Sequence, residues 1–359
     1  MMYKKRLIII SILVVLVICI RLFSISHFNT EYYYSTGVYP YIASFFRHIF
    51  GWIPISVGDI LYGTVATWLL VKFWKAIKAV VTKKITWRYF LLKSFSGFIK
   101  LFVIYIVFNL LWGINYNRQG IAAQLGITIE KYSTEDLKNI TTILLQKVNE
   151  NKTIIIKSSA VLKTNTEMFN HSAAAYSIAD KKFAFLQYKT SSVKSSLWSY
   201  IGNYIGFAGY YNPFTGEAQV NTTGPRFLLP FVTCHEIAHQ LGYAKENEAN
   251  FVGFLAASSS KDSLLLYSTY LDMFLYADRN LYSVDSVAAK NFVQQLIPEV
   301  KTDLQEIRDF NIRHKNPIEP VIRWVYGKYL QSNQQPNGNL SYDEVTGLLI
   351  TYYKKYGSL

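Results

Sequence analysis

Two histidines and a glutamate occur together in the run His235-Glu236-Ile237-Ala238-His239. Residues four apart stack on one face of a helix, so the imidazoles of His235 and His239 can bind one zinc ion. Glu236 is offset by about 100° around the helix, where it can accept a proton from a zinc-bound water. The pattern therefore predicts a hydrolytic zinc site, which needs a third protein ligand and an open fourth position.

The third ligand must come from residues that follow the zinc helix. In an unbroken helix Glu246 would lie about 10 Å along the axis from His239, so the chain has to turn back. Gly242 can adopt the left-handed conformation that ends a helix, and a second helix would then begin. We expect Glu246 to be the ligand, with Glu248 as the alternative. Asn250 shares a helix face with Glu246 and would orient an imidazole.

The ordinary alternative is an amphipathic helix that carries two histidines by chance. The chain has only six His residues, so a chance match to this motif is expected in about one in a few hundred such sequences. Zinc is therefore the favoured interpretation.

A family resemblance points the same way. The spacing Glu246-x-x-Ala249-Asn250 resembles the corresponding element of gluzincin metallopeptidases. The stretch 209–221, with Leu229-Pro230-Phe231 and the zinc motif after it, resembles an uncharacterised bacterial family of membrane-anchored His-Glu-x-x-His proteins. The resemblance covers most of the chain and implies a zinc metallopeptidase, with Glu246 as a ligand.

Three apolar segments in the N-terminal third predict membrane-spanning helices at residues 7–23, 57–77 and 94–114. The first could be a signal peptide, but no small-x-small cleavage site follows it. Seven basic residues and no acid lie from Lys72 to Lys93, which predicts a cytoplasmic loop and a cytoplasmic N-terminus. We expect residues 1–115 to form the membrane domain of a multi-pass bacterial plasma-membrane protein. Residues 116–359 would form a periplasmic or extracellular zinc domain.

The formal net charge of +14 could suggest nucleic-acid binding. Residues 1–115 hold 13 of the 37 Lys and Arg residues but only two acidic ones, so the basicity belongs to the membrane half. We expect a lipid bilayer as partner and no nucleic acid. Cys19 lies in the first predicted span and Cys234 on the predicted zinc helix, so no disulfide between them is expected. Cys234 is interpreted as a small buried residue.

The segment 28–56 is rich in tyrosine, phenylalanine and tryptophan. Such side chains suit a membrane interface, and the alternative is a small extracytoplasmic packing element. Asp59 stands near the start of the second span. It could be functional, but a capping role at the helix start is favoured.

The zinc domain is expected to be a mainly α zincin-like α+β domain with a small β hairpin. Helical spacing predicts helices at 134–149, 166–187, 264–278, 284–309 and 321–331, the fourth kinked or divided at Pro298. Ser341-x-x-Glu344 predicts a capping box for a final helix. A short β-like run is expected at 153–156, and two hairpin strands at 205–211 and 217–222.

Residues 216–221 are interpreted as an edge strand that could bind an extended peptide by main-chain pairing, or as a structural hairpin strand. A hydrolytic zinc site usually has a donor for the developing oxyanion. Several side chains could supply it, and the sequence does not select among Tyr210, Tyr211, His314 and Arg323.

These features predict a membrane-anchored metallopeptidase that needs Zn2+ and cleaves a peptide or protein substrate in the cell envelope, with Glu236 as general base. Two other functions remain open. One is an inactive zincin that acts as a membrane-tethered binding or sensing protein. The other is zinc-dependent hydrolysis of a non-peptide substrate in the cell envelope.

Overall fold

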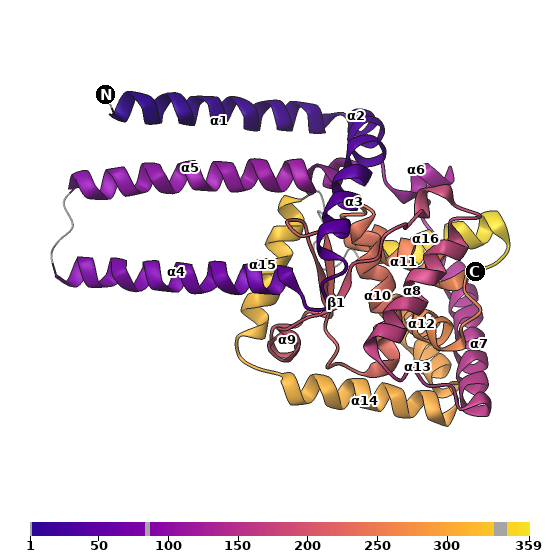
Figure 1. Ribbon diagram of the computed structural model, residues 1–359. Coiled ribbons are helices and arrows are strands. Elements are labelled where there is room, and N and C mark those ends of the chain that lie inside the picture. Colours follow the sequence, from indigo (N-terminus) through magenta and orange to yellow (C-terminus); the bar gives the residue numbers. More distant parts are fainter. Residues whose placement is uncertain (1, 83–86, 334–342) are drawn as a thin grey trace.

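Three long helices near the N-terminus extend away from one side of a globular part (Figure 1). The computed structural model describes residues 2–82, 87–333 and 343–359. The long helices are α1 (Met2–Ile25), α4 (Val57–Val81) and α5 (Trp87–Leu111). The segments Lys5–Ile25, Val57–Val81 and Lys93–Leu111 are long and apolar enough to cross a membrane, which is consistent with a membrane protein. The three expected spans are therefore present as helices. α1 and α4 extend beyond the predicted ranges, whereas α5 ends at Leu111, three residues before the predicted end of the third span.

The segment between the first two spans is helical and packs against the globular part. It comprises α2 (His27–Asn29), the π-helix η1 (Thr30–Val38) and α3 (Tyr39–Phe50). Its inward face is held by Glu31, whose carboxylate accepts two hydrogen bonds from the Arg118 guanidinium at 2.7 and 3.0 Å. Its outward face leaves aromatic side chains exposed, among them Tyr41 and Trp52. The segment is thus a packing element that also presents aromatic residues to the outside.

The globular part is mainly helical. After α5 come η2 (Gly113–Asn117), α6 (Ile121–Leu125), α7 (Thr134–Ser158), α8 (Asn165–Ala179), η3 (Ala184–Leu186), α9 (Ser199–Ile205) and η4 (Arg226–Leu228). The C-terminal half consists of α10 (Leu229–Gln240), α11 (Glu246–Ser258), α12 (Ser263–Val284), α13 (Ser286–Gln294), α14 (Pro298–His314), α15 (Glu319–Ser332) and α16 (Asp343–Tyr356).

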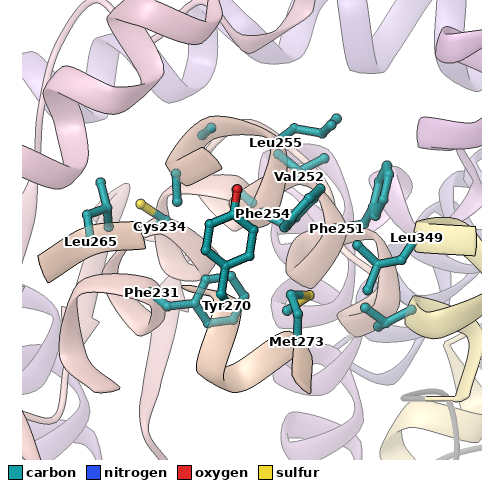
Figure 2. Packing of buried hydrophobic residues seen from close by; sticks show 14 of the residues in the cluster. Phe231, Cys234, Phe251, Val252, Phe254, Leu255, Leu265, Tyr270, Met273 and Leu349 are labelled. Carbon is teal, nitrogen blue, oxygen red and sulfur yellow. The ribbon is translucent and has the colours of Figure 1, made fainter. Parts of the chain in front are cut away.

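The core forms where α10, α11 and α12 meet, with α16 closing one side (Figure 2). Phe231 and Cys234 come from α10, and Phe251 and Phe254 come from α11; all four side chains are buried. Burying a side chain of this kind contributes about 1.5–3 kcal/mol relative to leaving it exposed. The helix that carries the two histidines is therefore fixed by the main core, and Cys234 is buried as expected.

The sheet has three short strands in the order β1-β3-β2. β1 (Val193–Ser195) runs parallel to β3 (Glu217–Val220), with Val193 opposite Ala218. β2 (Gly209–Asn212) runs antiparallel to β3, with Gly209 opposite Val220. The expectation of an edge strand at 216–221 was wrong, because the unpredicted strand β1 occupies the other side of β3. β3 is the central strand, and β1 and β2 are the two edge strands.

Several helix boundaries differ from the predicted ones for physical reasons. The expected β-like run at 153–156 was wrong, because α7 continues through it to Ser158. Residues 205–208 are not strand, since α9 ends at Ile205 and β2 begins at Gly209. Either a kink or a division of the helix was expected at Pro298. The structure shows a division, because α14 begins at Pro298. The predicted capping residue Ser341 lies outside the described residues.

Asp59 connects the start of α4 to the globular part. Its backbone N–H donates to the side chain of the N-cap residue Ser56 at 3.0 Å. Its carboxylate accepts from the backbone of Leu197 at 2.6 Å and from the hydroxyl of Tyr210. The capping role expected of Asp59 was wrong, because Ser56 caps α4. The Asp59 carboxylate instead links a candidate span to β2.

Candidate metal centre

The chain reverses direction between α10 and α11, as the spacing of the motif requires. Gly242 has a φ of +86°, in the left-handed region, and its N–H donates to His239 O at 3.0 Å. Tyr243 N–H donates to Ala238 O at 3.2 Å, which closes the helix end. α11 then begins at Glu246. At Gly253 of α11 an added Cβ would lie 3.1 Å from His235 N, so the two helices pack closely beside the first histidine.

This reversal brings together the side chains of His235, His239 and Glu246, whose potential ligand atoms all lie within 4.8 Å of one another. The two Nε2 atoms are 3.1 Å apart. Glu246 Oε2 lies 3.2 Å from His235 Nε2, and Glu246 Oε1 lies 3.8 Å from His239 Nε2. Four ligands with bonds of about 2.0–2.2 Å at tetrahedral angles have neighbouring ligand atoms about 3.3–3.5 Å apart. The three residues therefore fit a zinc ion in both chemistry and spacing.

The orientation of His239 is fixed by its own helix end. Its Nδ1 lies 2.7 Å from the carbonyl oxygen of Tyr243, and a protonated Nδ1 leaves the lone pair on Nε2 free for a cation. The Trp112 ring stands edge-on to this imidazole, with the ring centroids 6.1 Å apart. Both contacts keep Nε2 directed at the ligand cluster.

Asn250 is buried on α11 and contributes to the electrostatics of His235. Among the described residues, however, His235 Nδ1 and Asn250 Nδ2 have no partner at hydrogen-bond geometry. The expectation that Asn250 orients an imidazole therefore stays a prediction.

Glu236 is buried beside β2, with 3% of its surface exposed. A Cβ added to Gly209 would lie 2.5 Å from Glu236 Oε1, so only glycine lets β2 approach this carboxylate so closely. Glu236 Oε2 has no hydrogen-bond partner among the described residues. Burial raises the pKa of Glu236 to about 8, with the Glu246 charge contributing further. A buried carboxylate with an unpartnered oxygen is suited to accept a proton from a substrate or a water.

The pKa values of the three candidate ligands diverge in the metal-free protein. Burial lowers the pKa of His235, but the hydrogen bond and charge of Glu246 outweigh it and raise the value to about 9. Burial and the neighbouring His235 lower the pKa of His239 to about 4. For Glu246, burial raises the pKa, and the two histidines together bring it down to about 2. Among the three candidate ligands, these shifts place a proton on His235, which is paired with Glu246.

The alternative ligands face other parts of the molecule. The Glu248 carboxylate lies against Gly120 and 3.8 Å from the Lys245 ammonium, on the side of α11 away from the cluster. The thiol of Cys234 points to the carbonyl of Ser172, and burial raises its pKa to about 12. Of the two glutamates considered as third ligand, the structure brings Glu246 to the histidines.

Of the four oxyanion candidates named from sequence, Tyr210, Arg323 and His314 make contacts away from the cluster, whereas Tyr211 accepts a hydrogen bond and packs on Trp112. Tyr210 donates to Asp59, Tyr39 donates to the hydroxyl of Tyr211 at 3.3 Å, and Arg323 pairs with Glu319. His314 packs on the ring of Phe310, with the ring centroids 4.3 Å apart.

A hydroxyl that sequence reasoning missed reaches the cluster instead. Tyr326 of α15 donates to Glu246 Oε1 at 2.8 Å. The sequence held no signal for this contact, because the two residues are 80 positions apart and join only through the fold.

The last carbonyls of α10 are bonded by residues that flank the spans. Tyr39 and Arg47 of α3 donate to Gln240 O at 2.9 and 3.2 Å. The indole of Trp112, directly after α5, donates to His239 O at 3.2 Å. Tyr39 and Arg47 satisfy a carbonyl that the helix end leaves unpaired, and Trp112 adds a second bond to His239 O, which also accepts from Gly242 N–H. The C-terminal end of α10 is therefore held by residues that flank the candidate spans.

Comparison with known proteins identifies a family but no characterised relative. No curated protein and no solved structure matched the chain. One family model matched, over residues 34–350, a range that includes the second and third spans, the sheet, and the helices that carry the two histidines and Glu246. The chain belongs to the family described as protein of unknown function DUF3810.

Proposed function

We propose that this protein is a membrane-anchored, zinc-dependent peptidase. The observation that carries the proposal is the convergence of His235, His239 and Glu246 at tetrahedral spacing, with the buried carboxylate of Glu236 on the same helix as the two histidines. Three protein ligands leave one coordination position for water or substrate, as in catalytic zinc sites, whereas structural sites are usually closed by four. This arrangement favours hydrolysis over a purely structural use of zinc.

The chain's own residues can perform the proton transfers of a hydrolytic reaction. When bound, zinc would lower the pKa of a coordinated water and polarise a carbonyl group. Glu236 accepts the proton of the attacking water and passes it to the leaving amine. Glu246 supplies the negative charge that balances the cation, and Tyr326 keeps that carboxylate in place through its hydrogen bond.

The position of β2 favours a peptide as the substrate. Asn221 N–H donates to Ala208 O at 2.8 Å. The main-chain groups of Ala208 therefore face β3. Because these groups alternate in direction along an antiparallel strand, the N–H and C=O groups of Gly209 and Tyr211 face away from β3. An extended peptide that pairs with this edge would pass beside Glu236, because Gly209 touches it. The substrate-binding edge is therefore assigned to β2 rather than to residues 216–221.

The decisive test compares Glu236→Gln with the wild-type protein, both purified in detergent and loaded with zinc. We expect bound zinc to be unchanged and hydrolysis of fluorescein-labelled casein to fall by about 10²–10⁴-fold, the usual contribution of a general base. Zinc is measured by elemental analysis. Equal casein hydrolysis by the variant and the wild type would refute the mechanism.

Glu246→Gln and Glu248→Gln form a matched pair of controls on α11. The first variant should lose zinc, because it removes a ligand. The second should retain zinc and activity, because burial already raises the pKa of Glu248 and its carboxylate faces Gly120. Loss of zinc in Glu248→Gln alone would contradict the ligand assignment.

A further inference from the structure

Two helices on the side of the globular part from which the spans emerge carry apolar side chains outward (Figure 1). At α9 these side chains are Leu197, Tyr200 and Ile201, which are 56%, 67% and 50% exposed. At α15 they are Val321, Trp324 and Val325, which are 58%, 64% and 53% exposed. We call these six residues the α9–α15 surface. Soluble domains seldom expose apolar residues in such a concentration unless they bind something there.

The two helices are joined to each other. The side-chain amide of Asn316, just before α15, donates to the carbonyl of Tyr204 in α9 at 2.6 Å. The ring of Tyr204 also stands edge-on to His314, with the ring centroids 5.0 Å apart. The apolar residues of α9 and α15 therefore belong to one surface.

This surface lies at the level of a candidate span. The indole of Trp198, at the start of α9, donates to Asp59 O at 3.2 Å, and a Cβ added to Gly63 would lie 2.8 Å from its ring. Gly63 is six residues into α4, about 9 Å along the helix axis at 1.5 Å per residue. Where α4 crosses a bilayer, α9 is therefore beside its first turns, at the depth of the lipid headgroups.

The spacing of apolar residues on α15 matches this position. Val321, Trp324 and Val325 are three and four residues apart and share one face of the helix. In Figure 1, α15 runs crosswise to α4, near the end of α4 that enters the globular part. An amphipathic helix oriented along the membrane plane places its apolar face in the headgroup region.

An adjoining face of α15 lies against the metal centre. Tyr326 donates to Glu246, and the hydroxyl of Tyr329 lies 3.0 Å from that of Tyr116, which follows α5. One short helix therefore touches a candidate zinc ligand on one face and presents Trp324 outward on another.

We propose that the α9–α15 surface lies in the outer headgroup region of the bilayer, and that the metal centre takes its substrates from the membrane. The substrate class is a polypeptide anchored in or on the same bilayer, with its scissile bond close to the anchor. The occupant of the surface is the lipid bilayer itself, because the surface is continuous with α4. The substrate class rests on the proposed peptidase function, whereas the placement of the surface does not.

The placement is tested with the full chain in nanodiscs that contain brominated phosphatidylcholine. A Cys19→Ser background receives single cysteines at Trp324→Cys and Leu197→Cys, each labelled with an environment-sensitive nitrobenzoxadiazole maleimide. Lys157→Cys is the control, since this residue is exposed and belongs to α7, a helix that runs along the side of the globular part away from the three long helices (Figure 1). We expect strong quenching at positions 324 and 197 and none at 157. Absence of quenching at both 324 and 197 would overturn the placement.

The substrate class is tested in proteoliposomes with one fluorogenic casein peptide, either free or carrying a palmitoyl chain. Confinement to the membrane raises the effective concentration, so we expect the palmitoylated peptide to be cleaved at least about tenfold faster. A Val321→Asp/Trp324→Asp/Val325→Asp variant should lose that advantage while still cleaving the free peptide. Equal rates for both peptides with the wild type would overturn the substrate class.

The two experiments separate failure of the inference from failure of the proposed function. If wild-type protein loaded with zinc cleaves neither peptide, the peptidase proposal and the substrate class both fail. The quenching result still decides whether the surface lies in the bilayer.

Discussion

The position of the Glu236 carboxylate depends on the absence of a side chain at Gly209. The carboxylate fits beside β2 only because position 209 has no side chain, and one of its oxygens has no partner among the described residues. A methyl group at 209 would lie 2.5 Å from Glu236 Oε1, too close for a contact, and would push the carboxylate away from its place beside the histidines.

Gly209→Ala should therefore impair turnover without removing the metal. We expect kcat for casein to fall by about 10²-fold, the effect of a displacement of about 1 Å at a reacting group. Zinc content should stay unchanged, since 209 touches none of the three candidate ligands. Gly224→Ala is the control, because a Cβ there would lie 4.0 Å from its nearest neighbours. Unchanged kcat in Gly209→Ala would contradict the role given to Glu236.

Zinc binding should depend on pH in a defined direction. The metal-free site holds a proton on His235, whose pKa is raised to about 9, and zinc must displace that proton. Affinity should therefore rise about tenfold per pH unit between pH 6 and 8. His239, with a pKa lowered to about 4, is already neutral in this range and releases no second proton.

This pH dependence is measured by competition with a chromophoric chelator of known pH behaviour. Glu246→Gln removes the carboxylate that holds the proton on His235, so its weaker binding should vary less with pH. A wild-type affinity that is independent of pH from 6 to 8 would rule out the proton on His235.

A site residue could be predicted where its relation to the others is fixed by nearby sequence, and not where it depends on how distant elements pack. His235, Glu236 and His239 could be predicted because their relation is fixed by one helical turn. Glu246 could be favoured because a glycine must end that helix, with Glu248 left as the alternative. Tyr326 could not be assigned, since its contact with Glu246 depends on how α15 packs. The close approach of Gly209 is equally a property of the folded chain.

At the scale of elements, the turn between α10 and α11 determines whether the ligands meet. Gly242 has a φ of +86°, and an added Cβ would lie 2.8 Å from the buried ring of Tyr39. Gly242→Ala should destabilise the protein by about 1–2 kcal/mol from backbone strain alone, with a further loss from the contact with Tyr39.

We expect Gly242→Ala to lower the midpoint of thermal unfolding by several degrees and to weaken zinc binding. Tryptophan fluorescence in detergent follows the unfolding. The control is again Gly224→Ala, which should match the wild type. A variant at 242 with unchanged midpoint and zinc affinity would show that another residue sets the geometry of the reversal.

The prediction of elements failed where tertiary packing outweighed local preference. The β-branched run at 153–156 favours a strand, yet α7 continues because Leu144, Val148, Asn151 and Ile155 extend one inward stripe at helical spacing. Likewise, β1 has only three residues and no distinct sequence pattern. Because β1 was not predicted, β3 was expected at the edge of the sheet, whereas it is the central strand.

At the scale of the molecule, the charge pattern predicts which side of the membrane holds the metal centre. The basic stretch of sequence from Lys72 to Lys93 should lie in the cytoplasm, so the globular part should lie outside it. In a Cys19→Ser background, a membrane-impermeant maleimide added to spheroplasts should label Glu130→Cys. It should label Lys78→Cys only after the membrane is permeabilised. The reverse pattern would place the metal centre inside the cell.

The bonds that hold the end of α10 have a consequence for biogenesis. Tyr39 and Arg47 precede the second candidate span, and Trp112 follows the third, yet all three donate to the carbonyls of Gln240 or of the candidate ligand His239. If α1, α4 and α5 cross a bilayer, these bonds form only when the helical segment between the first two candidate spans and the segment after the third lie on the same side. We therefore expect a misinserted chain to lack the bonds that hold the end of α10.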